Sequence, residues 1–148
     1  MASLARLITV LAAGLVLVGC GGGTGAPKAS VAPALTIEKV EGSDLAKLTL
    51  SERAVQRLAI ETAPVAQRSV GTSTSLAIPY AAVLYAPDGK TWTYTSPADR
   101  VFMRAPIVVD RIDGDTALLK DGPAAGTVVV TVGSAELYGA ERGVGGGH

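Results

Sequence analysis

Residues 78–95 read IPYAAVLYAPDGKTWTYT and contain a strong turn signal between two strand-like runs. Within the central Pro-Asp-Gly, proline sets φ near about −65° and glycine accepts a positive φ, so the chain reverses direction here. The flanking runs, Ile78 to Tyr85 and Lys90 to Thr95, are predicted to be the two strands of a hairpin. On the second strand Trp92 and Tyr94 share one face and threonines share the other, which suits a sheet packed on one side.

Downstream of this hairpin the pattern continues with strands. Residues Val101 to Arg111 and Asp115 to Lys120 flank the dipeptide Asp113-Gly114, a strong tight-turn signal, and are predicted to pair. Pro106 places the first of these strands at an edge or near a bulge, because proline cannot donate to a ladder. After a Gly- and Pro-containing turn, the Val-rich run Thr127 to Val132 predicts a further strand buried on at least one face.

Upstream, one strand and one helix are predicted. Ala46 to Leu50 alternates apolar and polar residues, which is typical of a half-buried strand. Ser51 is a good N-cap, and apolar residues spaced three apart follow it, so residues 52–59 are predicted to form the only short helix. Residues 60–65 are predicted to be extended. The polar stretch 66–75 gives no strand signal.

These elements predict an all-β domain over residues 34–138, a small barrel or sandwich of about six to eight short strands with one short helix. The segments on either side are rich in glycine and small residues. Residues 20–33 are predicted to be a flexible linker and residues 139–148 a flexible Gly-rich tail.

The first nineteen residues have the pattern of a signal peptide. Arg6 precedes the apolar run Leu7 to Val18, which is shorter than the roughly 20 residues that a membrane-spanning helix needs. The tetrapeptide Leu-Val-Gly-Cys that ends at Cys20 is similar to the lipobox of bacterial lipoproteins, and the chain has one cysteine. We therefore expect residues 1–19 to be removed and Cys20 to be acylated. The alternatives are a buried cysteine or a free thiol after an ordinary leader.

Charge and composition argue against several functional classes. Removing Arg6 from the 13 basic residues leaves 12 against 13 acidic ones, a formal net charge of −1 that does not favour nucleic acid. The one histidine, His148, stands on the Gly-rich tail, so we predict no catalytic residue and no enzyme activity. A cluster of aspartates has no calcium-loop spacing and is read as solvated turns, so no metal or cofactor is predicted. This cluster comprises Asp110, Asp113, Asp115 and Asp121.

Three further groups of residues have a structural and a functional interpretation. Trp92 and Tyr94 can form a recognition stripe, but in a domain with few aromatic residues they more often fill the core. Four arginines can meet anionic lipid or a partner, but a solvated face is the commoner role. These are Arg53, Arg57, Arg104 and Arg111. Gly89 and Gly126 are read as backbone requirements of turns rather than ligand contacts.

Residues 48–65, LTLSERAVQRLAIETAPV, resemble the opening strand and helix of the periplasmic adaptor subunits of bacterial efflux pumps, also called membrane fusion proteins. The second half is similar to the C-terminal end of that family, in the segments 78–83, 88–94, 122–129 and 133–137. In the family both stretches belong to the membrane-proximal domain, and a β-barrel, a lipoyl-like domain and a long helical hairpin lie between them. Here only residues 66–75 separate the two stretches.

The resemblance implies a short, free-standing membrane-proximal domain that lacks the lipoyl and hairpin parts. We expect an exported protein, anchored to the extracytoplasmic face of the cell membrane through acylated Cys20, that docks on an inner-membrane transporter or another envelope protein. The alternative is a stand-alone ligand-binding or structural envelope lipoprotein unrelated to transport, which a deep apolar pocket would favour.

Overall fold

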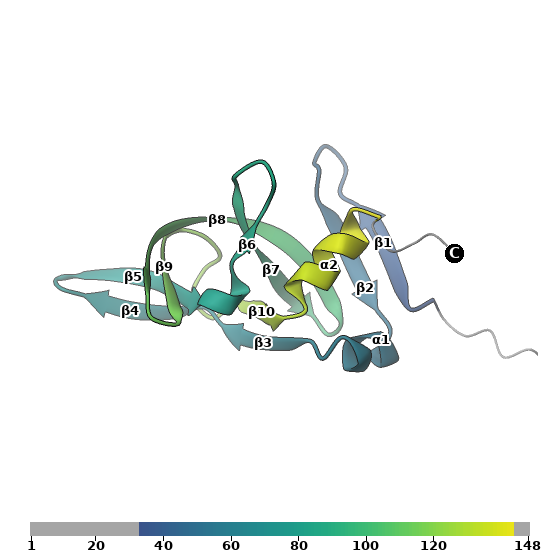
Figure 1. The fold of residues 1–148 in the computed structure, drawn as a ribbon, viewed down its shortest axis with the longest axis horizontal. Coiled ribbons are helices and arrows are strands. Elements are labelled where there is room, and N and C mark those ends of the chain that lie inside the picture. Colours follow the sequence, from purple (N-terminus) through teal and green to yellow (C-terminus); the bar gives the residue numbers. More distant parts are fainter. Residues whose placement is uncertain (1–32, 144–148) are drawn as a thin grey trace, which may run out of the picture. The chain divides into compact units, whose positions relative to one another are not determined.

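The described residues, 33–143 of the computed structural model, fold into antiparallel strands with two short α-helices (Figure 1). The elements are β1 (Leu35–Lys39), β2 (Ala46–Leu50), α1 (Glu52–Arg57), β3 (Glu61–Pro64), β4 (Ala66–Val70), β5 (Ser73–Pro79), the 3-10 turn η1 (Tyr80–Ala82), β6 (Leu84–Tyr85), β7 (Thr91–Ala98), β8 (Val101–Asp113), β9 (Thr116–Asp121), β10 (Val128–Val132) and α2 (Ser134–Glu141). The predicted all-β class is confirmed. The predicted helix is also confirmed, and the hydroxyl of its N-cap Ser51 accepts a hydrogen bond from the Ala54 N–H at 3.2 Å.

The long strand β8 holds the sheet together. Its first residues pair with both β2 and β7, and its last residues pair with β9 around the predicted Asp113-Gly114 turn. The strand order is β3-β10-β7-β8-β9-β5-β4, with the hairpin of β1 and β2 attached to the start of β8. Register shifts after Val108 bend the strand, and Pro106 lies between the part that pairs with β2 and the part that pairs with β9. The bend curves the sheet into a half-barrel.

Two hydrophobic clusters form the core of the domain. One cluster joins β2, α1, β7, β8, β10 and α2 around Leu48 and Tyr94, and the other joins β5, β8, β9 and β10 around Ile78. Adjacent residues of β10 belong to different clusters, because Val129 packs into the second and Val130 into the first. Successive side chains of a strand point to opposite faces, so β10 is buried on both sides.

The polar stretch 66–75, which gave no strand signal, forms β4, a turn at Gly71 and the start of β5. The side chains of β4 are exposed for four of its five residues, and β4 pairs with β5 alone. An edge strand with two solvated faces has no apolar alternation, which is why its pattern gave no signal.

The predicted first strand of the 78–95 hairpin is wrong in its extent. It breaks after Pro79, where the chain enters η1 and then the two-residue strand β6. Ile78 pairs with Ala117 of β9, whereas Leu84 and Tyr85 pair with β7 as predicted. Proline cannot donate a ladder hydrogen bond, and the next N–H, that of Tyr80, bonds the carbonyl of Asp115 at 2.7 Å instead.

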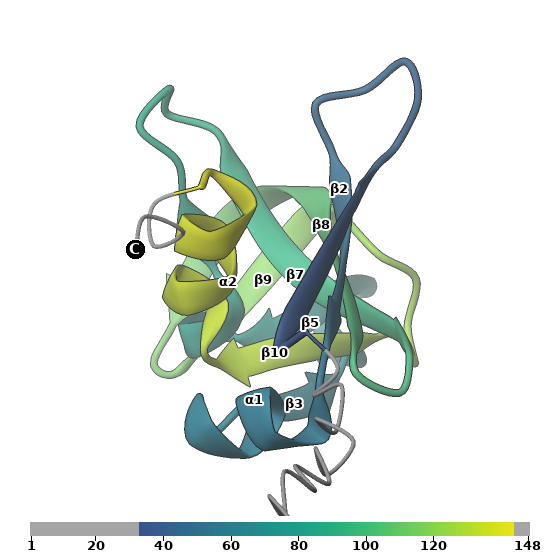
Figure 2. The ribbon, with the colours of Figure 1, turned by 90° about the vertical axis from the view of Figure 1, so that its right-hand side faces the viewer.

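The sequence predicted a single helix, but a second one, α2, begins after Gly133, whose φ is +93°. The helix continues through Glu141, so the predicted boundary between residues 138 and 139 falls inside it. In Figure 2, α1 lies below β10, with α2 on the left and the β1–β2 hairpin on the right. Cys20, the leader, the linker up to residue 32 and the tail from residue 144 lie outside the described residues.

Two neighbouring valines of β10 offer a test of this packing. Val129 is fully buried and Val128 is 37% exposed. We expect Val129→Ala to lower the free energy of unfolding by about 2–3 kcal/mol, because two buried methyl groups are lost and a cavity remains. Val128→Ala carries the same change of β-propensity and should cost less than about 1 kcal/mol. Urea denaturation followed by circular dichroism measures both, and equal losses would contradict the arrangement.

Candidate functional site

A buried ion pair links the carboxyl end of α2 to the middle of β8. Arg104 donates from Nε to Glu141 Oε2 at 2.8 Å and from Nη2 to Glu141 Oε1 at 2.9 Å. The side chains of these residues are only 2% and 3% exposed. Arg104 Nη2 also donates to the carbonyl of Asp44 at 3.1 Å, which ties the β1–β2 loop to the pair. The two parallel bonds are the bidentate geometry that guanidinium and carboxylate groups favour.

Three aromatic side chains complete this arrangement, which we call the Arg104 cluster. The guanidinium carbon of Arg104 lies 4.5 Å from the ring centre of Trp92 and 5.5 Å from that of Tyr138. The Tyr94 hydroxyl donates to Glu141 Oε2 at 2.5 Å. Burial raises the pKa of Tyr94, and the hydrogen bond to the Glu141 carboxylate raises it further. Glu141 therefore accepts three hydrogen bonds from protein groups, which makes the cluster structural rather than a site open to a ligand.

The cluster corrects two predictions. Arg104 does not belong to a solvated face, since it is 3% exposed, and Glu141 lies in a helix rather than in a flexible tail. Tyr94 fills the core as predicted, whereas Trp92 is only half-buried. The sequence contained one signal that was missed, because a lone arginine in the middle of an apolar strand requires a buried acidic partner.

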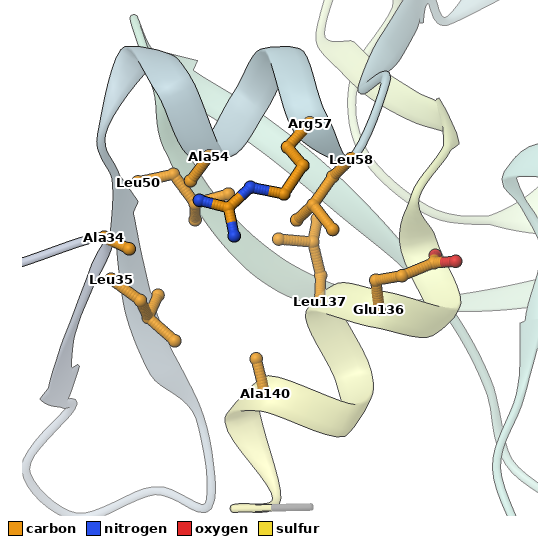
Figure 3. A pocket seen from close by; sticks show the side chains of 9 residues that line it. All are labelled: Ala34, Leu35, Leu50, Ala54, Arg57, Leu58, Glu136, Leu137 and Ala140. Atoms are coloured by element: carbon orange, nitrogen blue, oxygen red, sulfur yellow. The ribbon is translucent and has the colours of Figure 1, made fainter. Parts of the chain in front are cut away.

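A cavity of about 170 Å³ lies beside the cluster, between β1, the end of β2, α1 and α2 (Figure 3). We call it the α1–α2 cavity. Its walls are mainly leucine and alanine side chains, and two charged residues stand among them. It is lined by Ala34, Leu35, Leu50, Ala54, Arg57, Leu58, Glu136, Leu137 and Ala140. An apolar concave site with few polar groups is the usual form of a small-molecule site.

The two charged residues of the α1–α2 cavity differ in orientation. In Figure 3 the Arg57 side chain extends from α1 toward Leu50, whereas the Glu136 carboxylate points away from it. Both residues are exposed, and no ion pair joins Arg57 to any acidic group among the described residues. The guanidinium is therefore free to bind an external anion.

A second surface with binding potential is the free edge of the sheet at β1. This strand pairs with β2 alone, and four of its five residues are exposed. Ile37 on β1 is 42% exposed and Val40, which follows the strand, is 36% exposed. An unpaired strand edge with apolar side chains is a template for association.

The remaining predicted residues lie where the sequence placed them, and apart from Arg57 none of them lines the α1–α2 cavity. Arg53, Arg57 and Arg111 are exposed, and Gly89 and Gly126 have positive φ, as turn positions require.

The aspartates around the turns form surface ion pairs. Lys120 Nζ lies 3.6 Å from Asp110 Oδ1, and Arg68 Nη1 lies 3.8 Å from Asp113 Oδ2. Within residues 33–143 no three acidic, histidine or cysteine side chains come together in a way that would hold a metal ion. Cys20 and His148 lie outside the described residues.

Neither helix in the described part of the chain has the length and hydrophobicity needed to span a membrane.

Comparisons with known proteins give one structural likeness. No family model matches the chain. No curated protein matches it either.

The chain is similar to an NMR structure that encompasses the N-terminal metal-binding site and the membrane proximal domain of SilB from Cupriavidus metallidurans CH34. The two are 22% identical, with a TM-score of 0.46, over 57% of this chain and 48% of that one. The likeness thus spans about half the length of the SilB chain.

The Arg104 cluster generates a stability prediction. We expect Glu141→Gln to lower the free energy of unfolding by about 3 kcal/mol, because the substitution leaves the buried Arg104 charge without a counter-charge. Glu136→Gln changes an exposed carboxylate of the same helix and is the matched control, with an expected effect within about 0.5 kcal/mol. Urea denaturation measures both variants. Similar effects at positions 136 and 141 would show that the ion pair does not hold α2.

Proposed function

We propose that this protein is a non-catalytic interaction module of the cell envelope, anchored through acylated Cys20 on the extracytoplasmic face of the membrane. In this proposal the domain corresponds to the membrane-proximal part of an efflux adaptor and docks on an inner-membrane transporter or another envelope protein. The observation that carries it is the free edge of β1, where an extended segment of a partner can add to the sheet by backbone hydrogen bonds.

The position of β1 along the chain supports docking near the membrane. The segment 21–33 separates Cys20 from the first described residues and reaches at most about 45 Å when fully extended. β1 begins at Leu35, directly after this segment. In this proposal the first described residues therefore lie no farther than about 45 Å from the acylated residue.

The two stretches that resemble the adaptor family also come together in space. Residues 48–65 include the end of β2, α1 and β3, whereas the segments 122–129 and 133–137 include the start of β10 and the start of α2. β3 and β10 are antiparallel neighbours, with Val129 opposite Ala63. Residues 66–75, which stand in place of the adaptor domains between these stretches, form β4, the turn at Gly71 and the start of β5. This arrangement supports the interpretation of the domain as a membrane-proximal unit closed by a short turn.

A second candidate function, a ligand-binding envelope lipoprotein, is favoured by the α1–α2 cavity. Its apolar walls and its volume of about 170 Å³ suit a small apolar group. This function and docking through β1 involve different surfaces, so one does not exclude the other.

The anchor is tested by metabolic labelling. Cells that express the full chain and are fed radiolabelled palmitate should yield a labelled protein in the membrane fraction. Cys20→Ser should remove both the label and the membrane association, because stable anchoring needs the acyl chains. Label that persists in Cys20→Ser, or its absence from the unchanged chain, would contradict lipidation.

Docking is tested by crosslinking in intact cells of the native host. A photoreactive amino acid at Ile37 on β1 should yield an adduct with an integral membrane transport protein. The same amino acid at Ser69, an exposed position on the β4 edge, is the control and should not yield that adduct. Adducts with lipid alone at Ile37, or identical adducts at both positions, would contradict docking through β1.

A further inference from the structure

The α1–α2 cavity combines an apolar interior with one unpaired cation at its mouth. We infer that it binds a single-chain anionic amphiphile, a free fatty carboxylate, with the alkyl tail between α1 and α2 and the carboxylate on Arg57. This inference concerns a different surface from docking through β1 and does not depend on it.

The interior fits an alkyl tail in size and chemistry. Engineered apolar cavities of about 150 Å³ stay dry and admit a benzene molecule, which has six carbon atoms. The α1–α2 cavity, at about 170 Å³, therefore has room for about six carbon atoms of a chain. Leu50, Leu58 and Leu137 supply its larger walls, and all three have little or moderate exposure.

Two alanines keep this space open. Ala54 of α1 and Ala140 of α2 both line the cavity, and Figure 3 shows them on opposite sides of it. A leucine at either position would place additional methyl groups in the space that a ligand tail needs. The cavity thus results from small residues on two helices, and α2 is held at its carboxyl end by the Arg104–Glu141 pair.

The head-group preference comes from Arg57. Its guanidinium has no ionic partner among the described residues and lies on the cavity side of α1, in the last turn of the helix. A planar guanidinium binds a carboxylate through two parallel hydrogen bonds. Arg53 stands one turn earlier on the same helix and is exposed, but it does not line the cavity. Glu136 also lines the cavity, but its carboxylate points away from Arg57, so an anionic head can pair with Arg57 while its apolar tail contacts the leucine and alanine walls.

The test is a titration of the full chain, with labelled methyl groups, by octanoate under NMR observation. We expect the methyl signals of Leu50, Leu58 and Leu137 to shift in a saturable manner. Octyltrimethylammonium has the same tail and the opposite charge, and it should bind at least tenfold more weakly. Affinity should rise about fourfold per methylene from butanoate upward, and it should level off once the tail fills the cavity.

Matched variants separate the head and tail contributions. Arg57→Glu should weaken octanoate binding at least tenfold, whereas Arg53→Glu makes the same charge change outside the cavity and should alter it less than twofold. Ala140→Leu should abolish the shifts by filling the cavity, with circular dichroism to check that the variant is folded. If Ala140→Leu does not fold, the comparison of Arg57 with Arg53 still decides the question.

Three results would overturn the inference: equal weakening by Arg53→Glu and Arg57→Glu, octanoate shifts that persist in a folded Ala140→Leu protein, or tight binding of the cationic amphiphile. The natural source of the ligand is identified by extracting the protein purified from cells and analysing the extract by mass spectrometry. A free fatty acid supports the inference. A two-chain phospholipid would refute the single-chain form.

Discussion

The structure depends on one buried charge pair, Arg104 with Glu141. Removing two charges from water costs free energy of desolvation. Two hydrogen bonds between Arg104 and Glu141 offset this cost, together with one from Tyr94 to the carboxylate and one from Arg104 to the Asp44 carbonyl. These contacts join β7, β8, α2 and the β1–β2 loop at one point. Because Leu137 and Ala140 belong to the same short helix as Glu141, the pair also fixes one wall of the α1–α2 cavity.

The sheet has unpaired edges at β1 and β4, and the two edges differ in the side chains that they expose. The β4 edge contains Gln67 and Arg68, and polar or charged edge residues discourage pairing with other chains. On β1 the charged residues Glu38 and Lys39 follow Ile37, whose apolar side chain stays exposed. Of these two edges, β1 is thus the one that retains exposed apolar surface.

Local chemistry made part of this fold predictable. The Ser51 cap, the alternation in Ala46 to Leu50 and the Asp113-Gly114 turn each depend on neighbouring residues, and the structure confirms the elements they predict. The remaining predictions failed because they concern residues that contact distant parts of the sequence. The Glu141 side chain is bound by Arg104, 37 residues earlier in the sequence, and no local pattern of residues indicates this contact. The α1–α2 cavity could likewise not be predicted from the sequence, because it forms where α1, α2 and β1 meet and no motif marks it.

Arg104 and Glu141 are 37 residues apart in the sequence, and this distance affects how the domain folds. A nascent chain grows from its amino end, so β8 is made before α2 and Arg104 exists for a time without its counter-charge. Hydrophobic collapse of the sheet in that interval would bury an uncompensated cation, which is strongly unfavourable. Closing the core around Arg104 is therefore favourable only together with the docking of α2, which couples the last helix to the sheet in folding.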